Sequence, residues 1–70
     1  MTLHDAIILL LTNSSSSSMT TVEIAEELNK QGLYQRKDGE AIQPSQVGAR
    51  VRQYEHLFIT IDGQISLRSE

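Results

Sequence analysis

The stretch PSQVGARVRQYEHLFITIDGQISL, residues 44–67, places a helical pattern directly before a hairpin pattern. Pro44 suits the first helical position, where its fixed φ fits and its missing N–H is not required. Either Gln43 or Ser45 can cap this helix, and the sequence does not choose between them. The apolar positions of a helix over 44–54 share one face: Val47, Val51 and Tyr54. The stretch therefore predicts a helix that buries a narrow face and leaves the rest of its surface polar.

Asp62-Gly63 lies between two β-branched runs and is the strongest short-range signal for a type I′ hairpin turn. Pairing of Ile61 with Gln64 fixes the register of the hairpin. Ile59 and Ile61 fall on the outer face and either need a second covering surface or remain exposed. The simpler expectation is that one or both tuck under the end of the first helix or the loop around Lys37. The face expected toward the core consists of Phe58, Thr60, Ile65 and Leu67.

A helix is expected over residues 3–12, where apolar side chains recur at helical spacing. Thr2 is its expected N-cap, and Asp5 places a negative charge in its first turn. Ile8 and Leu9 lie beside the inward stripe and either widen it or form a weak homodimer contact. The stripe itself consists of Leu3, Ala6, Ile7, Leu10 and Leu11.

A second helix is expected over about residues 21–31. It opens with a capping box formed by Thr20 and Glu23, and it ends at Gly32, which can adopt the left-handed conformation. Met19 precedes the cap and can pack on Ile24 as a hydrophobic staple. The inward stripe continues through Val22, Ala25 and Leu28.

Two connecting segments separate these helices. The run Asn13–Ser18 has nothing to bury and is expected to be a flexible serine-rich loop, with a regulatory serine cluster as the less favoured interpretation. Residues 33–43 contain the turn signal Asp38-Gly39, followed by a small strand at residues 41–42. The predicted order is helix, helix, small strand, helix, hairpin. This order predicts one α+β domain over residues 1–70, a small winged helix-turn-helix with three helices and a C-terminal β-hairpin wing.

Composition excludes several classes of function. The chain has 70 residues and no cysteine, which rules out disulfides and thiolate metal sites and fits a reducing, cytoplasmic location. No apolar run approaches the roughly 18 residues of a membrane span. His4 and His56 are the only histidines and are far apart in sequence, so we expect no metal, no cofactor and no catalytic site.

The net charge is −3, but its distribution is uneven. Residues 1–34 contain four acidic side chains and one lysine, Lys30. Residues 35–70 contain five basic and five acidic side chains. The positive charge therefore lies toward the second half of the chain, where the polar helix is expected.

The chain resembles the HARE-type winged helix-turn-helix family, in particular the bacterial members that occur with restriction-type and other DNA-processing domains. The resemblance covers Leu3 to Leu67 and rests on VEIAEEL followed by GLY, on PSQVGARVRQY, and on HLF leading to the DG hairpin. It implies a DNA-binding or DNA-sensing module, a role in DNA restriction or transcription regulation, and no enzymatic activity of its own. A relative in bacterial RNA polymerase works within a protein assembly.

Duplex DNA is the expected partner, contacted by the helix over 44–54 with help from the 36–37 loop and the wing. Arg can pair with guanine and Gln with adenine in the major groove. The expected base contacts are Ser45, Gln46, Ala49, Arg52 and Gln53, and the expected phosphate contacts are Arg36, Lys37, Arg50 and Arg68.

The alternative function is a protein-binding adaptor that recruits a nuclease, a polymerase or another DNA-associated partner. Its expected surface is either the exposed stripe of Ile59 and Ile61 with Tyr34 or Leu33, or the acidic face of the second helix. In either case the chain is expected to be a monomer or a weak homodimer. Salt separates the two functions, because binding through phosphates weakens with salt and an apolar contact does not.

Overall fold

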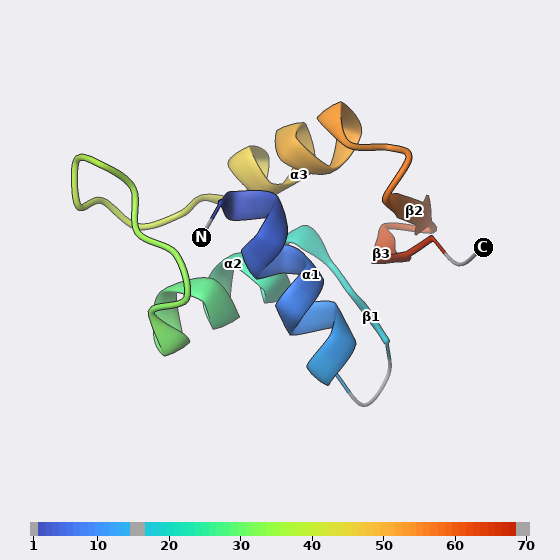
Figure 1. Cartoon of the computed structure of the whole chain (residues 1–70), viewed down its shortest axis with the longest axis horizontal. Coiled ribbons are helices and arrows are strands. Elements are labelled where there is room, and N and C mark those ends of the chain that lie inside the picture. The colour runs from blue at the N-terminus through green and yellow to red at the C-terminus, as the bar shows by residue number, and fades with distance from the viewer. Residues whose placement is uncertain (1, 15–16, 69–70) are drawn as a thin grey trace.

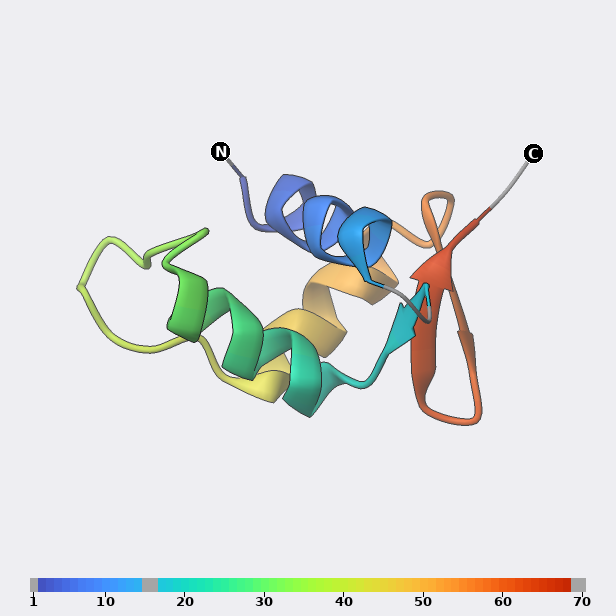
Figure 2. The same ribbon diagram turned by 90° about the horizontal axis from the view of Figure 1, so that it is seen from below.

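The computed structural model describes residues 2–14 and 17–68. Among these residues the three helices pack together, and a three-stranded antiparallel sheet closes one end of the bundle (Figure 1, Figure 2). The loop between the second and third helices extends from the other end. No described helix has the length and apolar character needed to cross a membrane. The elements are, in order, α1 (Leu3–Asn13), β1 (Ser18–Met19), α2 (Thr21–Gln31), α3 (Pro44–Gln53), β2 (Phe58–Ile61) and β3 (Gln64–Leu67).

The ends of the first two helices follow from local hydrogen bonds, as expected. The Thr2 hydroxyl accepts the Asp5 N–H at 3.2 Å, and the Thr2 hydroxyl also holds the pKa of Asp5 below its ordinary value. In α2 the capping box is complete: Glu23 N–H donates to Thr20 Oγ1 at 3.1 Å, and Thr20 N–H donates to Glu23 Oε1 at 2.9 Å. Gly32 ends α2 with a left-handed φ of 64°.

The hairpin has the predicted register, with Ile61 opposite Gln64 and Phe58 opposite Leu67. Asp62 and Gly63 have φ values of 51° and 78°, as a type I′ turn requires. Phe58 and Ile65 are buried, whereas Thr60, on the same face, is exposed. Thr60 was expected on the core side, but it lies on the edge strand β2, whereas its partner Ile65 on the central strand β3 is 1% exposed.

The third strand of the sheet was predicted at residues 41–42, but it lies at residues 18–19. Ser18 and Met19 form β1, which pairs antiparallel with Ser66 and Ile65 on the free edge of β3. The segment that connects α1 to α2 runs along this edge of β3. Its pairing there satisfies N–H and C=O groups of β3 that do not pair with β2. The expected loop Asn13–Ser18 is therefore shorter, since Asn13 belongs to α1 and Ser18 to β1; its centre, residues 15–16, lies outside the described residues.

Residues 41–42 are not a strand, because the side chain of Asn29 replaces a strand partner. Asn29 Nδ2 donates to the Ile42 carbonyl at 3.0 Å, and the Ile42 N–H donates to Asn29 Oδ1 at 2.9 Å. These two bonds hold the long loop against α2 while Ile42 enters the core.

The core combines residues from all three helices, the loop and the sheet. Val22 was expected to face inward, but it is 51% exposed, because α2 buries Ile24, Ala25 and Leu28 instead. Met19 and Tyr54 are half-buried against the core. The fully assembled core consists of Leu3, Ala6, Ile7, Leu10, Leu11, Ile24, Ala25, Leu28, Ile42, Val47, Val51, Phe58 and Ile65.

Replacing Asn29 with alanine should lower the free energy of unfolding by about 1–2 kcal/mol, because the N–H and C=O of Ile42 both lose their partner. Urea unfolding followed by circular dichroism measures this change. Lys30→Ala, at an exposed position of the same helix, is the matched control and should change stability by less than about 0.5 kcal/mol. Equal stability of the two variants would contradict the role of Asn29.

Candidate functional site

The outward face of α3 is polar and free of acidic side chains. Val47 and Val51 are buried, and Gln43 rather than Ser45 is the N-cap, with Pro44 at the first turn. This fixes the rotation of the helix about its axis. The residues left exposed are Ser45, Ala49, Arg52 and Gln53. Four of the five residues expected to contact bases therefore lie on the accessible side of α3.

Gln46, the fifth, is partly committed to the helix itself. Its Oε1 accepts the N–H of Gln43 at 3.0 Å, and the residue is half-buried. This hydrogen bond satisfies a backbone donor at the start of α3. The amide NH₂ is then the part of Gln46 that can act as a donor to a ligand.

A hollow of about 240 Å³ lies between α3, the start of α1 and the long loop. It unites two expected phosphate contacts, Arg36 and Arg50, which come from the loop and from α3. Tyr34 and Leu3 supply its apolar part. The hollow also includes three residues expected to contact bases: Gln46, Ala49 and Gln53.

The charge of Arg36 is already paired. Its Nη2 donates to Asp38 Oδ2 at 2.7 Å, and both side chains are partly exposed. Asp38 Oδ1 accepts the N–H of Glu40 at 3.0 Å, and the N–H of Gly39 donates to the Arg36 carbonyl at 3.0 Å. Asp38 thus shapes the predicted turn and also reduces the positive potential at Arg36. Lys37, on this turn, is exposed.

Arg52 and Arg68 lie on the other flank of α3, around a second hollow of about 250 Å³ formed with β2. The guanidinium of Arg68 donates to the carbonyls of Glu55 at 3.1 Å and Phe58 at 3.2 Å. Arg68 therefore ties the end of the hairpin to the segment that follows α3. The sequence offered no signal for this role, because the two carbonyls are defined only by the folded backbone.

The expected nine-residue set thus does not form one cluster. Arg36 and Arg50 line one flank of α3, and Arg52 and Arg68 line the other. The loop around Lys37 and the hairpin lie at opposite ends of the molecule (Figure 1). The exposed face of α3 is the surface that connects the two flanks.

Ile61 is exposed, as the sequence allowed, but the two isoleucines of the wing do not form a stripe with Tyr34 or Leu33. Ile61 is 62% exposed and Ile59 is half-buried beside Arg52, so neither is covered by the Lys37 loop. Tyr34 lines the hollow of Arg36, and Leu33 lines a groove between α1 and α2. A single exposed isoleucine at the wing tip does not form a contiguous apolar patch.

His4 and His56 both lie next to Tyr54, an arrangement that the sequence did not predict. The rings of His4 and Tyr54 stack with centroids 4.1 Å apart and planes at 25°, and the centroids of Tyr54 and His56 are 6.0 Å apart. These contacts join the start of α1 to the end of α3. Within residues 2–14 and 17–68, no group of three histidines, cysteines or acids is placed to hold a metal ion.

A family model described as HARE-HTH, an HTH domain named in part for ASXL and restriction endonucleases, matches residues 1–69. The matched range includes all the described helices and strands. Neither the curated proteins nor the solved structures provide a significant match.

Changing Arg68 to alanine should lower the free energy of unfolding by about 1 kcal/mol, since two backbone carbonyls lose a charged donor. Thermal or urea unfolding measures the change. Arg52→Ala removes the same charge from an exposed side chain beside Arg68, and the Arg52 guanidinium has no hydrogen bond or ion pair to the described residues. That control should stay near wild type, and a loss of similar size in both variants would show that charge, not the carbonyl contacts, matters.

Proposed function

Because the chain belongs to the HARE-HTH family, we propose that it binds duplex DNA, with α3 lying in the major groove. The observation that supports this function most directly is the exposed face of α3, which presents Ser45, Ala49, Arg52 and Gln53. No acidic residue occurs between Pro44 and Tyr54 to repel phosphate. Such side chains suit base edges, since Arg recognises guanine and Gln recognises adenine.

The two flanks of α3 supply the phosphate contacts in this proposal. Arg50 and Arg36 face one strand of the backbone, and Lys37 extends the contact along the loop. The molecule is 35 Å long, which is close to the length of one turn of duplex, about 34–36 Å. Arg68 contributes mainly by fixing the wing, because its guanidinium already serves two carbonyls.

Binding by one copy is expected to be weak and strongly salt-dependent. With about three or four phosphate contacts, affinity should fall roughly 100-fold between about 50 and 200 mM salt. The wing tip adds little attraction, because its exposed residues are Ile61, Asp62, Gly63 and Gln64. The affinity therefore depends on α3 and on the loop of Arg36 and Lys37.

The test is an NMR titration of the ¹⁵N-labelled protein with a mixed-sequence duplex at low salt. Shifts should gather on residues 36–37 and on the exposed positions of 45–53. Changing both Arg50 and Arg52 to alanine should weaken binding at least tenfold and reduce the salt dependence.

Lys30→Ala is the matched control, because it removes a positive charge from α2, away from the proposed surface. It should retain most of the affinity. The proposal fails if wild-type protein shows no shifts on α3, or if the Lys30 variant is weakened as much as the double variant.

Replacing Asp38 with asparagine should strengthen DNA binding by about two- to fivefold at low salt, because the substitution releases Arg36 from its ion pair. Asparagine keeps the Oδ1 that accepts the Glu40 N–H, so the turn is preserved. Fluorescence anisotropy with a labelled duplex measures the gain, which should shrink as salt is added. Glu26→Gln makes the same change of charge on exposed α2, and an equal gain there would show that net charge alone is responsible.

A further inference from the structure

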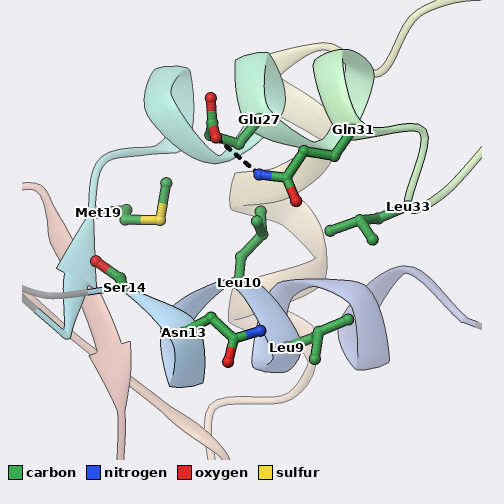
Figure 3. A pocket seen from close by; sticks show the side chains of 8 residues that line it. All are labelled: Leu9, Leu10, Asn13, Ser14, Met19, Glu27, Gln31 and Leu33. Carbon is green, nitrogen blue, oxygen red and sulfur yellow. Dashed lines mark hydrogen bonds between the residues drawn. The ribbon is translucent and has the colours of Figure 1, made fainter.

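A groove of about 450 Å³ runs between α1 and α2, and the proposed DNA-binding surface does not use it. The ribbon of α3 lies behind this groove, so the groove opens on the face of the molecule away from α3 (Figure 3). Met19 lies at one end and Leu33 at the other. The groove is therefore a second accessible surface, separate from the exposed face of α3.

Four of the residues that line the groove are apolar: Leu9, Leu10, Met19 and Leu33. The side chain of Leu10 lies between the two helices and is 6% exposed (Figure 3). Leu9 lies beside it on α1 and is 36% exposed. Met19 and Leu33 are half-buried. Methionine adapts to partners of different shape. A groove with apolar residues can bind the apolar face of an amphipathic helix.

One acidic residue, Glu27, lines the groove. None of the described residues that line it is basic, and Glu27 lies on the α2 side, where its Oε1 accepts the Gln31 Nε2–H at 2.8 Å. Helical spacing places Glu23 one turn before Glu27 and Lys30 one turn after it. Lys30 is the only lysine or arginine in residues 1–34. Residues 1–34 carry four acidic side chains against this one lysine, and this charge balance favours a positively charged amphipathic ligand.

We propose that this groove binds a basic amphipathic helix of a partner protein. The apolar face of that helix packs on Leu9, Leu10, Met19 and Leu33, while its Lys and Arg side chains lie against Glu27 and the other acids of α2. The same charge disfavours DNA, and it disfavours a second copy of this chain, whose corresponding surface is equally acidic. Because the groove faces away from α3, DNA and the partner can be bound together.

A fluorescent peptide of about 14 residues, with leucine at i, i+3, i+4 and i+7 and lysine elsewhere, provides the probe. Anisotropy should show binding to the wild-type protein, and amide shifts should gather on the groove residues of α1 and α2. Leu9→Gln should weaken binding at least fivefold, and Glu27→Lys at least tenfold. Thermal unfolding of each variant verifies that the fold is retained, and Glu27→Lys leaves the core untouched.

Two controls separate the groove from general charge attraction. Val22→Gln changes an exposed apolar residue of α2 outside the groove and should bind the peptide as wild type does. A shuffled peptide of the same composition, with leucines spread around the helix, should bind at least tenfold more weakly. Equal binding of the shuffled peptide, shifts centred on α3, or no binding at millimolar peptide would overturn the proposal.

The outcome is independent of the proposed DNA function. The variant with Arg50 and Arg52 both changed to alanine should bind the peptide with wild-type affinity, because neither residue lines the groove. Loss of DNA binding with retained peptide binding, or the reverse, distinguishes failure of one proposal from failure of the other.

Discussion

Burial of Phe58 and Ile65 in the core that the three helices share is the interaction on which the rest of the structure depends. Three helices of 10 or 11 residues bury little apolar surface by themselves, and the chain has no disulfide to compensate. The hairpin closes the open end of the bundle with its inner face. That packing fixes the direction of the wing and leaves Ile61 in solvent, and it presents the free edge of β3 to the segment that becomes β1.

The features that were predictable from the sequence are those decided within a few residues. Thr20 and Glu23 define the start of α2, Gly32 defines its end, and Asp62-Gly63 fixes the register of the hairpin. In each case a specific backbone conformation or a short-range hydrogen bond selects the residue type. β1 was not predictable, because Ser18 and Met19 have no strand pattern of their own and become a strand only through the edge of β3. The role of Asn29 was hidden for the same reason, since its partner is 13 residues away in the loop.

In the candidate site too, some features follow from the local sequence and others are set only by the folded chain. Periodicity identified the outward face of α3, because a helix that buries Val47 and Val51 must expose Ala49 and Gln53. It could not show that Arg68 is held by backbone carbonyls, nor that Arg36 is already paired with Asp38. Both facts depend on where flexible side chains settle after folding. A count of basic residues therefore overstates the charge that is free to contact a ligand. The groove between α1 and α2 has no pattern in the sequence, because two helices form it jointly.

Because α2 is acidic and α3 carries no acidic side chain, an electric field tends to orient the molecule. Near a polyanion, the field pulls on the α3 side and pushes on the α2 side, and the resulting torque turns the molecule before any contact forms. Fewer collisions then arrive with the wrong face, so the association rate can exceed what a net charge of −3 would suggest. Cations that screen the field shorten the distance over which this alignment acts. Added salt should therefore lower the association rate with a polyanion as well as the affinity for it.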